Sequence, residues 1–123
     1  MKKNAVNWFE LYVADFARAK RFYEAILKLT MQEASCSGSK MAIFPYDSNE
    51  GIGGALTEMA GCNPGGGGTL IYLNVEGDLD GVLDRTAKCG GTIIKPRTAI
   101  GEHGFIGIIK DSEGNLVGLH SMK

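Results

Sequence analysis

The chain has 123 residues, about the length of one domain, and a domain of this size buries enough apolar surface to fold without a disulfide or a structural metal. Hydrophobic residues make up 44% and charged residues 22% of it, so the composition indicates neither a disordered chain nor a membrane protein. The net charge of -1, with no run of basic residues, provides no basic surface for nucleic acid.

The first predicted strand is VNWFELYV, residues 6–13. Its residues alternate, so that one side is apolar and suits a core. The other side carries an indole, a carboxylate and a phenol, from Trp8, Glu10 and Tyr12. A strand face of this kind needs an explanation other than core packing.

Asp15 follows as the predicted N-cap of an amphipathic helix, in which apolar residues recur at spacings of three and four up to Leu27. Three short strands are predicted after the helix, at residues 30–36, 40–46 and 53–59.

The second half of the chain repeats this order. It comprises a strand at 69–75, a helix from Asp78 to the glycines of CGG, and strands at 91–96, 104–110 and 115–121. The turn segments DSNEGIGGALT (47–57) and DSEGNLVGLH (111–120) also match, which pairs Asp47 with Asp111 and Ala55 with Gly118.

The glycine-rich segment NPGGGG, residues 63–68, has the composition of a flexible hinge between the two halves. A phosphate-binding loop is the competing interpretation. The segment lacks the Lys and Ser/Thr of such a loop and leads into a strand, which disfavours that interpretation.

These segments resemble the vicinal oxygen chelate superfamily, which includes glyoxalase I, the bleomycin-resistance proteins and the extradiol dioxygenases. The opening WFELYVADFARAKRFYEAIL is similar to the family's strand, Asp and RAxxFY helix, and DSEGNLVGLH resembles its DPDGxxxEL hairpin. GGAL, YLNV and IGLHS-type segments are typical of its small glyoxalase-like proteins. The resemblance implies an α+β fold in which two βαβββ modules form a curled, incomplete eight-stranded barrel around a cleft. We expect a single domain over residues 1–123, with module one at about 5–60, a linker at about 61–68 and module two at about 69–123.

Metal-using relatives take His, Gln or Glu ligands from the first and last strands of each module. By the resemblance these positions fall on Trp8, Ala55, Leu70 and Gly118. None of these side chains offers an imidazole, carboxylate, carbonyl or thiolate donor. The resemblance therefore implies a cleft without the usual metal site, in which Trp8 fills the floor, and we expect no cofactor.

Side chains on a strand repeat their facing every two residues, which extends the cleft face from these positions to further polar residues. Glu10 and His120, on strands of different modules, are the candidate catalytic residues. A carboxylate beside an indole in a partly dry cleft should have a raised pKa and act as a general base, and an imidazole opposite it could exchange a proton with a carbonyl or enol. The alternative is structural: Glu10 would satisfy an amide or pair with an Arg, and His120 would be a polar residue near the C-terminal edge.

The candidate ligand-binding residues are Trp8, Tyr12, Thr57, Tyr72, Asn74 and His103. Tyr72 has the alternative of packing within the sheet. His103 lies in the glycine-flanked loop IGEHGF (100–105), which could close over the cleft or be exposed.

Three functions remain open. The first is a metal-independent protein that binds a small organic molecule around Trp8. The second is a glyoxalase-like lyase or isomerase with Glu10 as base, either metal-free or with a relocated metal held by Glu10 and His120. The third is a dimeric interaction module with a vestigial cleft, and a homodimer is expected for this superfamily.

Cys36, Cys62 and Cys89 are widely spaced and odd in number, which disfavours a disulfide framework or a zinc knuckle and suits a reducing cytoplasm. At the N-terminus, Glu10 and Asp15 interrupt the apolar stretch that a signal peptide would need. We expect a cytoplasmic protein without a membrane span.

Overall fold

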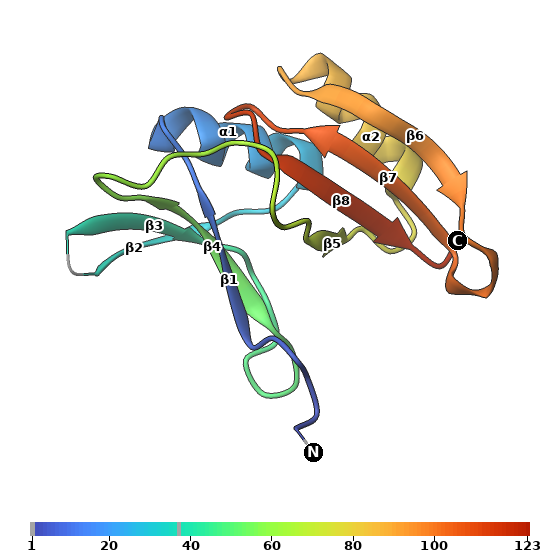
Figure 1. Ribbon diagram of the computed structural model, residues 1–123, viewed down its shortest axis with the longest axis horizontal. Coiled ribbons are helices and arrows are strands. Elements are labelled where there is room, and N and C mark those ends of the chain that lie inside the picture. Colours follow the sequence, from blue (N-terminus) through green and yellow to red (C-terminus); the bar gives the residue numbers. More distant parts are fainter. Residues whose placement is uncertain (1, 37) are drawn as a thin grey trace.

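The computed structural model describes residues 2–36 and 38–123. The fold is α+β and consists of two βαβββ modules in the predicted order (Figure 1). Module one contains β1 (Trp8–Tyr12), α1 (Phe16–Leu27), β2 (Gln32–Cys36), β3 (Ser39–Ile43) and β4 (Gly53–Glu58). Module two contains β5 (Tyr72–Asn74), α2 (Leu79–Lys88), β6 (Thr92–Ala99), the short 3₁₀ helix η1 (Gly101–His103), β7 (Phe105–Lys110) and β8 (Leu116–Ser121). Of the described elements, only η1 was not predicted.

The strands form two separate four-stranded sheets with the same topology, in the orders β1-β4-β3-β2 and β5-β8-β7-β6. In each sheet the first strand is parallel to the last, and the remaining pairs are antiparallel. The described strands do not close into a barrel, and the two sheets diverge from each other in Figure 1.

The strand register confirms the internal repeat. The backbone N–H of Val13 donates to the carbonyl of Thr57, and that of Val75 donates to the carbonyl of His120, both at 3.0 Å. These two rungs are equivalent in the two modules. Two residues earlier on β4 and β8 stand the residues that the turn motifs paired, Ala55 and Gly118.

Helix α1 begins as the sequence predicted. The side chain of Asp15 accepts a hydrogen bond from the backbone N–H of Arg18 at 3.0 Å, and Glu58 of β4 accepts another from Phe16 N–H at 3.0 Å. The helix ends at Lys28, whose left-handed backbone (φ 54) returns its N–H to the carbonyl of Glu24. The apolar stripe is buried and consists of Ala19, Phe22, Tyr23 and Ile26.

Helix α2 begins differently. The Asp78 side chain makes no capping hydrogen bond and instead pairs with Arg85, about two helical turns further on. At the other end, Gly90 adopts a positive φ of 97 and Gly91 N–H donates to the carbonyl of Thr86, so the predicted glycines do end this helix.

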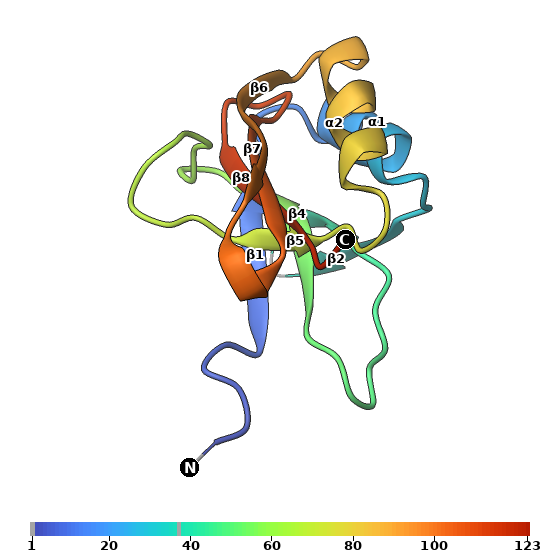
Figure 2. The same cartoon turned by 90° about the vertical axis from the view of Figure 1, so that its right-hand side faces the viewer.

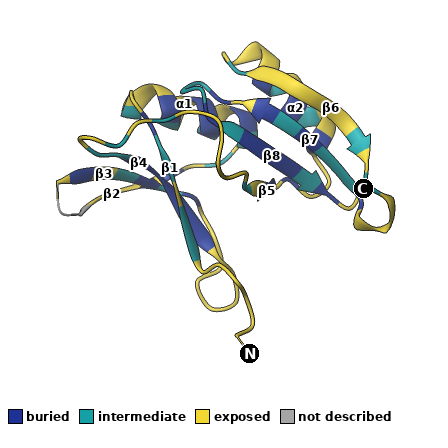
Figure 3. Cartoon of the chain, in the orientation of Figure 1, coloured by how far each residue is buried: buried dark blue, intermediate teal, exposed yellow. Residues whose placement is uncertain are grey.

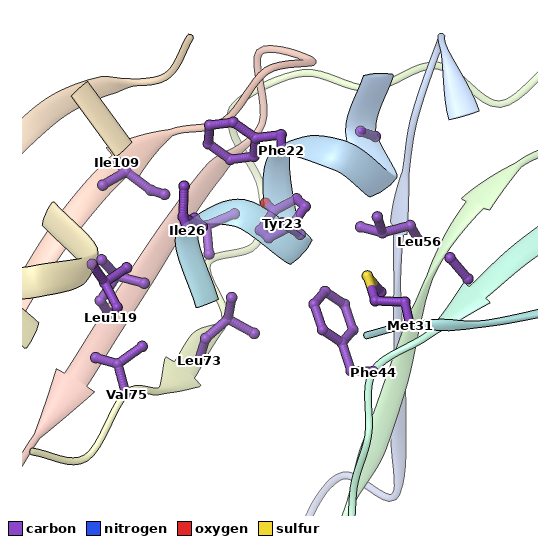
Figure 4. Close-up of a cluster of buried hydrophobic side chains, with 14 of the residues drawn as sticks. Phe22, Tyr23, Ile26, Met31, Phe44, Leu56, Leu73, Val75, Ile109 and Leu119 are labelled. Atoms are coloured by element: carbon purple, nitrogen blue, oxygen red, sulfur yellow. The ribbon is translucent and has the colours of Figure 1, made fainter. Parts of the chain in front are cut away.

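The two modules share one hydrophobic core. Figure 4 shows Tyr23 and Ile26 of α1 between Phe44 of module one and Leu119 of module two. The two helices lie next to each other on one side of the molecule (Figure 2). Buried residues concentrate in β4 and β8, while much of β6 is exposed (Figure 3). No described helix is both long and apolar enough to cross a membrane.

Candidate functional site

The open face of sheet one is the side of the β1-β4-β3-β2 sheet that points away from the core. The predicted alternation of β1 is confirmed, because Phe9 and Leu11 pack against the core. Phe9 also lies against the backbone of Gly54, where a Cβ atom would collide with its ring. Trp8 and Glu10 therefore lie on the open face.

A hydrogen-bonded triad occupies the centre of this face. The indole Nε1–H of Trp8 donates to Glu10 Oε2 at 3.2 Å, and the hydroxyl of Thr57 donates to Glu10 Oε1 at 3.0 Å. Thr57 comes from the neighbouring strand β4, where it stands beside Tyr12 in register. One donor on each oxygen fixes the orientation of the Glu10 carboxylate. The structure thus brings together three of the predicted site residues.

Tyr12 extends the same face toward the linker. A side-chain hydrogen bond with the Cys62 thiol, followed by Coulombic interaction with that group, raises the pKa of Tyr12. Cys62 reaches this position through a bridge with Met59, in which Cys62 N–H donates to the Met59 carbonyl at 3.1 Å. The phenol of Tyr12 is consequently a neutral hydrogen-bonding group beside the Glu10 carboxylate.

Tyr46 is a neighbour of the site that the sequence did not predict. Its ring stands edge-on to Trp8, with 5.9 Å between the ring centroids, and it covers Gly53 of β4. A side chain at position 53 would collide with the Tyr46 ring. The glycine at the start of GGAL was the available indication, although it does not identify which ring fills the space.

The equivalent face of sheet two carries the other predicted residues. The Tyr72 ring lies over Gly118, and Asn74 stands beside His120 in register. The Nε2–H of His120 donates to the backbone carbonyl of His103 at 2.7 Å, because a carbonyl oxygen only accepts. This bond attaches the η1 loop to β8.

Glu10 and His120 belong to different sheets, and the bonds described above hold each of them within its own module. No described contact joins the two side chains in a single chain. Glu10 is also exposed, which differs from the partly dry cleft expected around its carboxylate.

The residues at the family's metal-ligand positions do not fit a metal. Trp8, Ala55, Leu70 and Gly118 carry no donor atom that would coordinate a divalent cation there. Trp8 engages its one polar atom with Glu10, and Leu70 is 40% exposed just before β5. Among the side chains that the structure describes, no three of His, Cys, Asp or Glu gather as a metal site would require.

A groove with a volume of about 510 Å³ runs between the modules. Tyr46 lines it from module one, and Leu70, Tyr72 and Asn74 line it from module two. The groove adjoins the open face of sheet one through Tyr46, which contacts Trp8. Two predicted ligand-binding residues are therefore groove residues.

Two sheets of identical topology, with a polar face on each, define a protein built on the paired βαβββ fold. The sequence profile of the Glyoxalase/Bleomycin resistance protein/Dioxygenase superfamily matches residues 5–119, and the chain belongs to this superfamily.

Individual relatives agree with this membership. The chain is 27% identical over 120 residues to CFP32 of Mycobacterium bovis and of Mycobacterium tuberculosis, a protein named as a glyoxylase; the match covers 96% of this chain and 46% of CFP32. The chain thus spans about half the length of the curated relatives it matches.

Solved structures show the same fold. A glyoxylase/bleomycin resistance protein/dioxygenase domain from Frankia sp. EAN1pec has a TM-score of 0.72 at 21% identity, with 99% of this chain and 94% of that chain covered. The fosfomycin resistance protein FosX from Listeria monocytogenes has a TM-score of 0.67 at 18% identity, with 98% and 92% covered.

Proposed function

We propose that this protein binds a small organic molecule on the open face of sheet one, around Trp8, without a metal ion at the family's ligand positions. The observation that carries the proposal is the Glu10 carboxylate, which is exposed and which Trp8 and the buried Thr57 hold in one orientation. An exposed strand position needs no such arrangement for folding. A carboxylate held in place beside aromatic rings is a typical feature of ligand recognition.

The chemistry of the four equivalent positions supports the metal-independent form. Two of them, Ala55 and Gly118, have no side chain that reaches beyond Cβ, and the other two are an indole and an aliphatic group. A metal would therefore need ligands that the fold's usual positions do not supply.

Trp8 is the sole tryptophan of the chain, which makes the proposal testable by fluorescence. We expect at least one compound of a broad panel of metabolites and antibiotics to change Trp8 emission saturably, with equal affinity before and after chelator treatment. Metal analysis of protein purified without added metal should give well under one ion per chain. Saturable binding that chelation abolishes, or no response to any compound, would contradict the proposal.

A lyase or isomerase reaction with Glu10 as general base is the enzymatic alternative, and the fixed orientation of its carboxylate favours it. The variant Glu10→Gln distinguishes a binding protein from an enzyme. Turnover of a bound compound that the wild type shows and Glu10→Gln loses, with binding retained, would favour the enzyme.

A homodimer in the cytoplasm completes the proposal. Large apolar side chains are exposed around the groove, namely Val6, Tyr46, Ile52, Leu70 and Tyr72. Such a cluster favours association with a second copy through the groove side of the molecule. The free thiols of Cys62 and Cys89 suit a reducing compartment; the side chain of Cys36 lies outside the described part of the chain.

A further inference from the structure

The charge on the open face of sheet one restricts what can bind there. Strand pairing places Met41, Ile43, Ala55 and Thr57 on the same face as Trp8 and Glu10. Among the strand side chains that the structure describes on this face, Glu10 is the sole formal charge. The charged residues of the neighbouring strands, Glu33, Lys40 and Glu58, alternate to the opposite side.

Glu10 also differs from the other strand carboxylates in its partners. Glu33 pairs with Lys20 at 3.2 Å, and Glu58 accepts the backbone N–H of Phe16 at 3.0 Å. Glu10 has neither a basic partner nor a backbone N–H among the described residues; its two donors are neutral side chains. The carboxylate is fixed in place with its negative charge uncompensated.

The surroundings of this carboxylate are aromatic. Trp8 and Tyr12 stand two residues before and after it on β1, and Tyr46 contacts Trp8. Aromatic faces attract cations through the ring quadrupole, and a carboxylate accepts N–H donors that a cation supplies. An anion or a carbonyl oxygen would be repelled by Glu10, since an ionised carboxylate donates no hydrogen bond.

We propose that the ligand of this site carries an ammonium, amidinium or guanidinium group, which binds Glu10 while its carbon frame packs against Trp8. This inference rests on the proposed function, because it names the chemical class of the molecule that binds around Trp8. It assigns Glu10 the part of a counter-charge that holds a cation.

Three near-isosteric probes test it: benzamidine, which is a cation, benzamide, which is neutral, and benzoate, which is an anion. Each is titrated into ¹⁵N-labelled protein while the Trp8 indole N–H signal is followed, since this N–H donates its hydrogen bond to Glu10. We expect benzamidine to shift the signal saturably, with benzamide and benzoate at least about tenfold weaker, the ratio that one charge-assisted hydrogen bond supplies.

Two variants localise the effect. Glu10→Gln should weaken the affinity for benzamidine about tenfold. Glu33→Gln removes a strand carboxylate from the other side of the same sheet and should leave this affinity unchanged. Thermal unfolding of both variants shows whether they fold. The comparison of the three probes on the wild type needs no variant at all.

The outcomes separate the two proposals. Equal binding of benzamide and benzamidine would overturn the cation proposal and leave the small-molecule site around Trp8 intact. Failure of benzamidine at millimolar concentration also overturns it, and the fluorescence panel then decides the proposed function by itself. Benzamidine binding that weakens as the protein concentration rises would mean that a second copy covers Glu10, and that result would overturn the proposal of a small cationic ligand.

Discussion

At the scale of single residues, the Glu113 side chain of module two links the two modules. Its carboxylate, on the β7–β8 hairpin, accepts the backbone N–H groups of Ala14 and Asp15 at 3.0 and 2.9 Å and pairs with Arg18 at 2.7 Å. Burial raises the pKa of this carboxyl, but these hydrogen bonds, with a further one from Ser112, outweigh burial and lower the pKa from 4.5 to about 2. The charged form is therefore the one that stabilises the fold.

Replacing Glu113 by Gln should lower the free energy of unfolding at pH 7 by about 2 kcal/mol, less than the full pKa change implies, because Arg18 is half exposed and screened by water. In the wild type the contribution is present above the unfolded-state pKa. It is lost as the pH falls from 4.5 to about 2. Urea unfolding across this range measures both effects, with the exposed loop variant Glu50→Gln as control. An unchanged acid limb in Glu113→Gln would contradict the assignment.

At the residue scale, the sequence predicted which side chains of one strand lie on the same face. Trp8 and Glu10 share a face because strand facing has a period of two, and the structure joins them. The sequence did not predict that the Tyr46 ring packs against Gly53 or that Cys62 forms a hydrogen bond with Tyr12, because those contacts depend on the paths of loops. Hydrophobic periodicity carries no information about loop paths.

At the scale of elements, two glycines give a matched comparison. A Cβ at Gly54 would strike the Phe9 ring, and a Cβ at Gly118 would strike the Tyr72 ring. Phe9 is partly buried and packs against the core, whereas Tyr72 is 47% exposed and can rotate into water. Gly54→Ala should therefore cost about 2 kcal/mol and Gly118→Ala less than about 1 kcal/mol.

Thermal unfolding of the two glycine variants checks this order. Equal losses, or a larger loss at Gly118, would show that Tyr72 is held as firmly as Phe9. That result would also favour a covered Tyr72 in solution, such as a dimer contact.

The helices and strands were predictable because each shows a clear period and is bounded by Asp, Gly or a turn motif. η1 was not, since three residues are too few to show a period. The incomplete barrel is realised as two separate sheets. How the modules meet depends on core packing around α1, which no local pattern encodes.

At the scale of the whole molecule, the shared core predicts one cooperative unfolding transition. Ile26 is fully buried in α1 between the modules, and its backbone carbonyl accepts the Nε–H of Arg85 from α2 at 2.9 Å. Ile26→Ala should cost about 3 kcal/mol and shift both modules together. Trp8 fluorescence reports on module one and the backbone amide signal of Leu119 on module two. Separate midpoints for these two probes would show that the modules unfold independently.

The central claim is that ligand binds on the open face of sheet one. Backbone amide signals of ¹⁵N-labelled protein, recorded with whichever compound changes Trp8 emission, test this claim most directly. We predict that the largest shifts fall on Trp8, Glu10 and Thr57. Large shifts confined to residues 70–74 along the groove, with those three signals unmoved, would contradict it.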